Sequence, residues 1–416
     1  MDLSLIIATN IQHMMEQAHV TQNELAVQLG LSRQTVSKLL NGKAPFDTVQ
    51  LEKVAGIFRV SVEDLLNKNS VTEIKICYRL TTSESAVPKG IKELLTQYIE
   101  KFRSLSVKVG EPSIFIPEQY NLFAKVKGKK IRVIGELENQ VNDYDEIDLD
   151  AALVDQISTI ADEQRKRLEL NDGGAIELIS ALSKKGIRVI FLDFGTDEVS
   201  GASICDQTFG CFIFVNTSLT VERQLFTVAH EYGRVLLHRQ MYSYSFGELS
   251  NKAYTKYLNL MASRFAARLL CPPALIARYD DELNKAKNDL QLILSVAVKI
   301  KHDAQVSLQS VMKSLKDYGY ISKAMHDEFF TLIADAGLLT KEPLPIAKGD
   351  NLYEKFLADR YYCVTELVVK GFFFRIISED DIAVLYNYSR EEVQRTYSYL
   401  VEESKKIADL FKIDTE

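Results

Sequence analysis

The stretch HEYGRVLLH, from His230 to His238, contains residue types that bind and activate a metal ion. In a zinc-hydrolase helix of the pattern H-E-x-x-H, two histidines four residues apart lie on one face and ligate the metal, and the glutamate is the general base for the metal-bound water. His230 and Glu231 are in place here, but Arg234 stands where the second histidine should be. A guanidinium donates no lone pair and stays protonated near neutral pH. The stretch therefore indicates either a hydrolase with another ligand or a hydrolase-like domain without its metal.

His238 is the nearest candidate for the missing ligand. It lies eight residues after His230, which on a helix means about 12 Å further along the axis and a rotation of roughly 80°. Zinc–nitrogen bonds are about 2.0–2.1 Å long. Because two imidazoles so far apart on one unbroken helix cannot meet one tetrahedral ion, His238 does not replace the second histidine.

A second group of candidate residues lies near the N-terminus, on a predicted pair of helices. Thr21 and Glu24 form a capping-box pattern at the start of the first helix, and Gly30 ends it. Ser32 caps a second helix that runs through Leu40. Helix, glycine turn and helix at this spacing are typical of a helix-turn-helix. Long or hydroxylated donors gather at the exposed start of the second helix, namely Arg33, Gln34, Thr35, Ser37 and Lys38.

These donors suit the major groove of DNA, because they can reach base edges and phosphates. No acidic residue occurs from Leu25 to Phe46, whereas Lys43 adds a further positive charge. A carboxylate on this face would repel the phosphates, so its absence favours DNA binding. The alternative interpretation is a helical protein-interaction module with a polar outer face.

The composition bounds the class of protein. A chain of 416 residues is longer than a domain with a single hydrophobic core usually is, which suggests roughly two to four domains. A hydrophobic content of 46% suits globular folding. The net charge of −7 argues against general nucleic-acid binding, so a DNA contact needs a local basic patch. The sequence has neither a long apolar run nor a signal peptide, so we expect a cytoplasmic protein without a membrane span.

The five cysteines are odd in number and form no C-x-x-C pair. This pattern predicts reduced, mostly buried thiols rather than a disulfide framework. A pairing of Cys205 with Cys211 stays open as the alternative.

Hydrophobic patterns predict a mainly α fold with a small mixed α+β part. Alternation in Glu73–Leu80 predicts a strand, and the segment around Gly128 predicts a hairpin. The predicted regions are a helix-turn-helix bundle at 1–68, an α/β connecting region with an acidic linker (Glu136–Asp150) at 69–150, a mixed central domain at 151–335, and a helical C-terminal module at 345–416.

Over about 60 residues the N-terminal region resembles the lambda-repressor-like, five-helix domain of XRE-family transcription regulators. Gln22 opens the first motif helix, L-G-L-S forms the turn, and S-R-Q-T-V-S-K-L-L-N-G-K forms the recognition helix and its exit. The resemblance implies that Gln22 binds backbone phosphate and that the Arg33–Lys38 positions read bases. It also implies a dimer on two half-sites roughly 34 Å apart.

The central region is similar to the ImmA/IrrE metallopeptidase family, with a zincin-like α+β fold. The matching segments, in the family's order, are Val199–Ile204, Phe212–Asn216, Arg223–His238, Ala262–Pro273 and Val306–Ser322. The resemblance places Met261 where the family has its third zinc ligand, a glutamate. A thioether is a poor zinc ligand, and no acidic residue occurs between Leu249 and Tyr279. With Arg234 and Met261 at ligand positions, we expect a degenerate catalytic site that holds no metal, in which Glu231 pairs with a nearby arginine.

Basic residues recur along the predicted helix that contains Met261, and two interpretations stay open for them. They form either a solvated face or a docking surface for an acidic partner, such as the Glu136–Asp150 segment. The residues are Lys252, Lys256, Arg264 and Arg268.

Together these features predict a sequence-specific, DNA-binding transcriptional regulator that binds a double-stranded operator as a homodimer. Its central pseudo-metallopeptidase domain is expected to sense a signal or to bind a peptide, protein or small-molecule partner, with no cofactor. We expect the C-terminal module to serve packing or dimerisation. The alternative is an active zinc-dependent peptidase that cleaves a repressor or an antitoxin.

Overall fold

The computed structural model describes the chain from Leu3 to Ser398 with gaps. The residues outside this description are 1–2, 18–19, 59, 67–75, 81–86, 89, 111–114, 127–128, 135–136, 138–148, 171–173, 207–208, 240–241, 243–251, 339–340, 374–376, 387, 390, 396–397 and 399–416. Most of the predicted acidic linker and the turn of the predicted hairpin lie outside it. The chain divides into two compact units, Met1–Ile74 and Lys75–Glu416.

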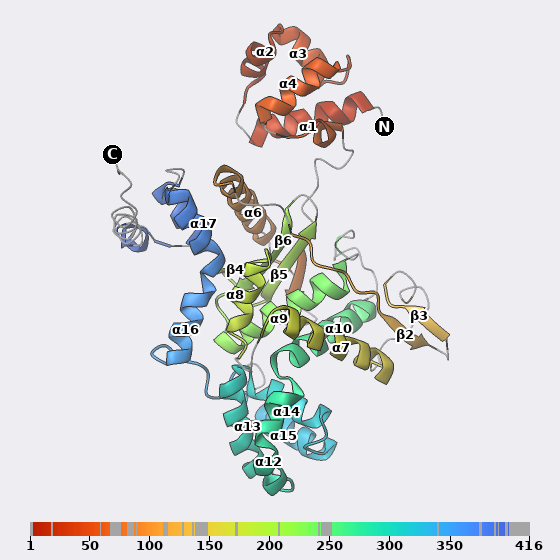
Figure 1. Cartoon of the computed structure of the whole chain (residues 1–416), viewed down its shortest axis with the longest axis vertical. Coiled ribbons are helices and arrows are strands. Elements are labelled where there is room, and N and C mark those ends of the chain that lie inside the picture. The colour runs from red at the N-terminus through yellow and green to blue at the C-terminus, as the bar shows by residue number, and fades with distance from the viewer. Residues whose placement is uncertain are drawn as a thin grey trace. The chain divides into compact units, whose positions relative to one another are not determined.

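The first unit is the predicted bundle of short helices (Figure 1). Apolar side chains from each of them, such as Ile11, Leu25, Val36, Val54 and Leu65, form its core. The described helices are α1 (Leu3–Gln17), α2 (Gln22–Leu29), α3 (Arg33–Leu40), α4 (Thr48–Phe58) and α5 (Val62–Leu66).

Local sequence signals set the ends of α2 and α3 as predicted. The Thr21 hydroxyl accepts a hydrogen bond from the Glu24 N–H at 3.3 Å, and the Glu24 carboxylate accepts one from the Thr21 N–H at 2.7 Å. Gly30 ends α2 with a φ of 71°, a left-handed conformation that glycine adopts without strain. The Ser32 hydroxyl accepts from the Thr35 N–H at 3.1 Å and caps α3.

The second unit is built on a mixed four-stranded sheet in the order β1–β5–β6–β4. The pairs β1–β5 and β5–β6 are antiparallel, and β4–β6 is parallel. A separate hairpin pairs β2 with β3, as predicted from the sequence. The strands are β1 (Cys77–Leu80), β2 (Phe123–Val126), β3 (Lys129–Arg132), β4 (Arg188–Leu192), β5 (Val199–Asp206) and β6 (Gly210–Asn216).

Helices cover both faces of the sheet (Figure 1). On one face lies α6 (Ile91–Lys108), whose Phe102 ring meets the Phe212 ring edge to face. On the other face lies α9 (Val221–Leu237), followed by α10 (Lys252–Leu270) and α7 (Ala151–Arg167). Every α9 residue except Arg223 and Phe226 is buried, so its charged residues lie inside the core.

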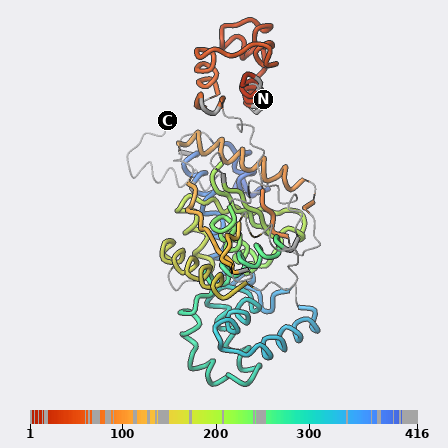
Figure 2. The backbone as a smooth tube through the Cα atoms, turned by 90° about the vertical axis from the view of Figure 1, so that its right-hand side faces the viewer, coloured from red at the N-terminus to blue at the C-terminus, as the bar shows by residue number. Residues whose placement is uncertain are grey.

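The other described helices complete the second unit. Figure 2 shows α12 to α15 gathered at one end of it. Within the described residues, no single helix has the length and apolar content to cross a membrane; the bent pair Tyr254–Leu270 and Pro273–Ala286 meets these criteria only when both are taken together. These helices are α8 (Glu177–Lys184), α11 (Pro273–Ile276), the 3₁₀ turn η3 (Ala277–Tyr279), α12 (Asp280–Ala286), α13 (Leu290–Ala304), α14 (Leu308–Asp317), α15 (Lys323–Asp335), α16 (Asn351–Arg360), α17 (Tyr362–Phe373) and α18 (Glu379–Tyr386).

The boundaries of compact structure differ from the predicted regions. The region 69–150 is not a separate connector, because it supplies β1 to the central sheet and α6 to one face of it. Within the region 345–416, the helices α16 and α17 pack against β4 and α8, so they belong to the same compact unit as the central sheet. Hydrophobic patterns identify these elements locally, but they do not show which distant strand or helix each one packs against.

Cys205 and Cys211 lie directly opposite each other on β5 and β6 and form a disulfide. The prediction of reduced thiols is therefore wrong for this pair, whereas Cys77, Cys271 and Cys363 form no disulfide within the part of the chain that the structure describes. The register of the β5–β6 hairpin brings the two sulfurs together, and spacing along the chain does not reveal that register.

Gly201 of β5 gives a test of how closely α9 packs on the sheet. A Cβ at this position would lie 2.8 Å from the backbone oxygen of Phe214 and would clash with the Thr227 methyl group. We expect Gly201→Ala to lower the free energy of unfolding of the second unit by about 1–3 kcal/mol, measured by chemical denaturation. The matched control is Gly56→Ala in α4, where the added methyl group meets open space and should stabilise the first unit by about 1 kcal/mol. A stable Gly201→Ala protein would contradict this packing.

Candidate functional site

Helix α3 places the predicted DNA-contacting residues on one side and its apolar residues on the other. Its apolar side is buried in the first unit through Val36, Leu39 and Leu40. The opposite side exposes Arg33, Gln34, Thr35 and Lys38, and Lys43 just beyond the helix is exposed as well. Arg33, Gln34 and Lys38 find no hydrogen-bonding partner among the residues that the structure describes. These side chains are therefore available to an external ligand.

The other residues predicted to contact DNA are Gln22, Thr35 and Ser37, which are half-buried or form hydrogen bonds within the first unit. Gln22 and Ser37 are half-buried. The hydroxyls of Thr35 and Ser32 lie 2.9 Å apart, and the Ser37 hydroxyl accepts from the Asn41 side chain at 3.4 Å. Thr35 and Ser37 thus contribute to the shape of the helix start in addition to any contact with DNA.

The second candidate site lies on α9, inside the core of the second unit. His230, Glu231, Arg234 and His238 are at most 2% exposed, and Met261 of α10 is fully buried. The structure brings the first three of these together. His238 caps the end of the helix, and its Nε2 atom is buried with no hydrogen-bond partner among the described residues.

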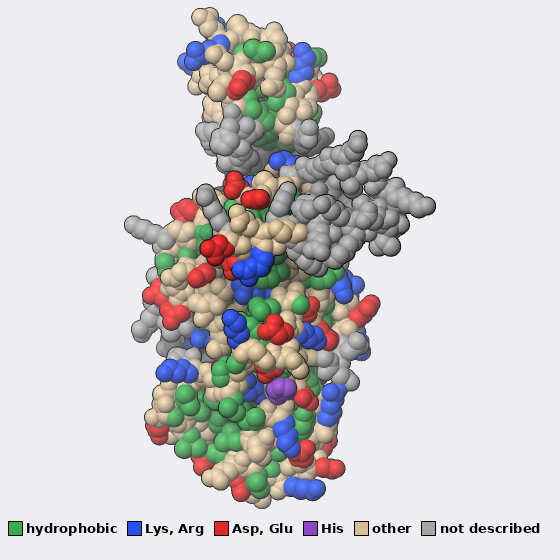
Figure 3. All heavy atoms as spheres, turned by 90° about the vertical axis from the view of Figure 1, so that its left-hand side faces the viewer, with side chains coloured by type: hydrophobic (Ala, Val, Ile, Leu, Met, Phe, Trp, Pro, Cys, Tyr) green, Lys and Arg blue, Asp and Glu red, His purple; other side chains and the backbone are tan. Residues whose placement is uncertain are grey.

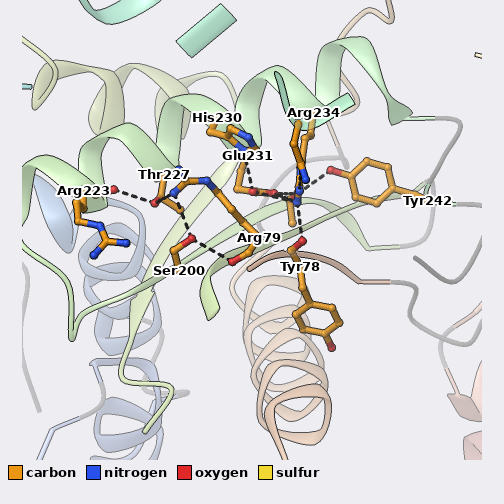
Figure 4. Close-up of polar contacts among 11 residues, drawn as sticks. Tyr78, Arg79, Ser200, Arg223, Thr227, His230, Glu231, Arg234 and Tyr242 are labelled. Carbon is orange, nitrogen blue, oxygen red and sulfur yellow. Dashed lines mark hydrogen bonds and ion pairs between the residues drawn. The ribbon is translucent and has the colours of Figure 1, made fainter. Parts of the chain in front are cut away.

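Arg234 contacts several neighbouring elements, and Figure 4 shows its contacts with Glu231 and Tyr78. Its Nη1 atom lies 3.2 Å from a carboxylate oxygen of Glu231, the pairing expected from the sequence. The same nitrogen donates to the backbone carbonyl of Tyr78 in β1 at 3.0 Å. Its Nη2 atom donates to the side-chain oxygen of Asn259 in α10. The guanidinium therefore links α9 to both neighbouring elements.

Glu231 is held on every side by polar groups. It lies 3.2 Å from Nδ1 of His230 and accepts from the Ser203 hydroxyl, which is 2.7 Å from the hydroxyl of Tyr242. Burial by itself would raise the pKa of Glu231, but the charge of Arg234 and the hydrogen bonds from His230 and Ser203 lower this pKa to about 2. A general base is effective when its pKa is near the working pH. Glu231 is therefore a poor base.

The two histidines of α9 are neutral at neutral pH. Burial and the nearby charge of Arg79 together lower the pKa of His230 to about 3. Burial and the charge of Arg234 likewise lower the pKa of His238 to about 3.

This donor set does not fit a zinc ion. Among the described residues, no group of three histidine, cysteine or carboxylate side chains is arranged to hold a metal. The carboxylate of Glu231 is engaged by Arg234, and the sulfur of Met261 is a poor donor for zinc. The second family ligand is replaced by a cation that would repel the metal.

Sequence reasoning missed the β1 residues of this site. The Nη1 atom of Arg79 donates to the hydroxyls of Thr227 at 2.7 Å and Ser200 at 3.2 Å, and its guanidinium lies 5.3 Å from the Phe226 ring (Figure 4). The alternation in Glu73–Leu80 predicted a strand here. The alternation did not predict that this strand pairs with β5, next to α9.

The predicted basic stripe of α10 is largely used within the second unit. Arg268 forms an ion pair with Asp162 of α7, and Arg264 forms one with Asp317 of α14. Lys256 is exposed, and the side chain of Lys252 lies outside the described residues. The two arginines therefore join helices of one unit, which removes half of the predicted docking surface.

The buried histidines predict that acid destabilises the second unit. Because the folded pKa of His238 is about 3 and the ordinary value is 6.5, the unfolded chain takes up a proton first, so stability falls as the pH drops from 6.5 towards 3. We expect His238→Gln to reduce the stability lost between pH 7.5 and 5, by on the order of 1 kcal/mol, measured by denaturation at both pH values. The control is His302→Gln, a change at an exposed residue of α13. An unchanged pH dependence in His238→Gln would contradict this account.

Comparisons with known proteins agree with this geometry. The model of the Cro/C1-type HTH DNA-binding domain matches residues 10–69, and the model of the IrrE N-terminal-like domain matches residues 182–316. No curated protein matches the chain. Among solved structures, a transcriptional regulator from Mycobacterium tuberculosis is similar at 17% identity, with 39% of this chain and 46% of that chain covered and a TM-score of 0.28.

Both resemblances drawn from the sequence motifs are thus confirmed. The first match contains α2 and α3, which carry the exposed donors, and the second contains α9, which carries the buried ion pair. The chain therefore combines a Cro/C1-type helix-turn-helix DNA-binding domain with an IrrE N-terminal-like domain.

Proposed function

We propose that this protein is a sequence-specific transcriptional regulator whose central domain is a pseudo-metallopeptidase. The observation that carries the proposal is the buried ion pair of Arg234 with Glu231, which occupies the general base that peptide hydrolysis would need. The central domain then serves as a sensor or a partner-binding module, and the first unit supplies the contact with DNA. A homodimer on two half-sites, acting in the cytoplasm, completes the proposal.

The surface of the first unit supports a role in DNA recognition. Arg33, Gln34 and Lys38 are exposed on the side of α3 that faces away from the core, and their long side chains suit contacts to base edges and phosphates. Lys43 follows as a phosphate contact, and Gln22 as a second one at the start of α2. On the face of the second unit that Figure 3 shows, basic and acidic side chains are interspersed rather than gathered by sign. The recognition surface is therefore assigned to α3.

The chain has the first two residues of the H-E-x-x-H pattern, His230 and Glu231. An active zinc peptidase is therefore the second candidate function. A working peptidase would need Glu231 released from Arg234 and at least two ligands beyond His230. Neither Arg234 nor Met261 supplies one, so the regulator is the better supported function.

Replacement of single residues on α3 tests the DNA contacts. Gln34→Ala should relax the preference at one base pair and weaken the selected site by about 1–3 kcal/mol, because a base contact carries sequence information. Lys43→Ala should weaken all sequences alike and reduce the slope of log K against log salt by about 1. Binding sites selected from a random DNA pool, followed by titration at several salt concentrations, measure both effects.

The control is Gln28→Ala, an exposed glutamine of α2 that should leave base preference unchanged. If Gln34→Ala keeps the full selectivity of the wild type, Gln34 is not a base-reading residue. If no sequence is enriched by the wild-type protein, sequence-specific recognition itself fails.

Metal content separates the regulator from the peptidase. Protein purified without a chelator should contain far less than one zinc per chain, and His230→Ala should not change that content, because Arg234 occupies the place of a ligand. Elemental analysis of both proteins checks this. Stoichiometric zinc that disappears in His230→Ala would restore the peptidase.

A further inference from the structure

Strand β1 is a short edge strand held to the sheet by one neighbour and two arginines. It spans only Cys77–Leu80 and pairs with β5 alone, with an irregular register between Arg79 and Leu80. Four residues at a sheet edge bring few ladder hydrogen bonds, and short edge strands are weakly held. Side-chain contacts therefore supply the stabilisation of β1 that its pairing with β5 does not.

The first fastening is the side chain of Arg79 itself. Its guanidinium is bound by the hydroxyls of Thr227 and Ser200 and lies over the ring of Phe226. The Ser200 hydroxyl in turn donates to the backbone carbonyl of Arg79 at 3.0 Å. These contacts are made with neutral groups of α9 and β5.

The second fastening is the contact set of Arg234 with the Glu231 carboxylate, the Tyr78 carbonyl and the Asn259 side chain, here called the Arg234 bridge. Its bond to Tyr78 reaches the backbone of β1, so it constrains the strand whatever side chain stands there. A guanidinium suits this task because its planar, rigid fork carries five donors and holds several acceptors at once. A lysine ammonium in the same place could neutralise Glu231 but could not span acceptors on three elements.

We propose that the Arg234 bridge is a structural lock for β1, and that the residue at the lost ligand position now holds the strand instead of a metal. Arg234 is in this sense a positioning residue that fastens β1 to α9 and α10 together. The lock is independent of whether the central domain binds a partner or a small molecule.

We infer a regulatory role for the Arg234 bridge from the position of β1 in the chain. β1 begins at Cys77, close behind the boundary of the two units at Ile74. The Arg234 bridge thus holds the first described strand of the second unit. Release of the four β1 residues would add about 13 Å of extended chain to the connection between the units. Any ligand that draws Arg234 away from Tyr78 would lengthen this connection and so change the distance over which the two DNA-binding units of a dimer can reach.

Hydrogen exchange of the full-length protein, followed by mass spectrometry, tests the lock. Arg234→Lys keeps a positive charge beside the buried Glu231 and removes the fork. We expect the amides of residues 76–80 to exchange at least about tenfold faster in this variant, while those of β4 and β6 change less than twofold. The matched control is Arg268→Lys, which weakens the ion pair with Asp162 and touches no β1 residue, so exchange in β1 should stay at the wild-type rate.

A second variant covers the case in which Arg234→Lys does not fold. Asn259→Ala removes the acceptor that orients the far side of the guanidinium, and it should accelerate exchange of residues 76–80 about threefold. Unchanged exchange of β1 in a folded Arg234→Lys protein, or acceleration no greater than that of β4, would overturn the proposal. Because this measurement needs neither DNA nor a ligand, failure of the lock and failure of the proposed DNA recognition are separate results.

Discussion

The central domain depends on one buried ion pair, that of Arg234 with Glu231. Both side chains are almost completely shielded from water, and an unpaired charge in that position would cost several kcal/mol. Each residue therefore requires the other, and neither is free for catalysis. The hydrogen bonds from His230 and Ser203 complete the solvation of the carboxylate. The charges of Arg234 and Glu231 thus compensate each other in the core, and neither is left alone.

The same ion pair determines the chemical character of Glu231. A carboxylate with a pKa of about 2 has little tendency to take a proton at neutral pH. The guanidinium also occupies, with its positive charge, the position from which a metal would be held. The burial of the site, the charge of Arg234 and the chemistry of the available donors all disfavour metal binding and base catalysis here. On the proposal of a pseudo-metallopeptidase, hydrolysis would need the removal of Arg234 and new ligands at the same time.

The cations of the two candidate sites lie in opposite environments. In the first unit, α3 leaves Arg33 and Lys38 in solvent, where a charged side chain stays hydrated and ready for a phosphate. In the second unit, Arg234 is drawn into the core and satisfied there by Glu231, Tyr78 and Asn259. An exposed cation recognises other molecules, whereas a buried cation with its partners joins the elements of its own domain.

The sequence by itself determined the features that depend on neighbours along the chain. The caps at Thr21 and Ser32, the left-handed Gly30 and the exposed side of α3 follow from local hydrogen bonding and helical periodicity. The misfit of Arg234 as a ligand follows from its chemistry alone. Only the tertiary structure decided which distant groups meet: the pairing of β1 with β5, the facing of Cys205 and Cys211, and the reach of Arg234 to Tyr78 and Asn259. Strand alternation marks a buried face but does not identify the partner strand or its register. These contacts therefore form only when the whole sheet and its covering helices pack together.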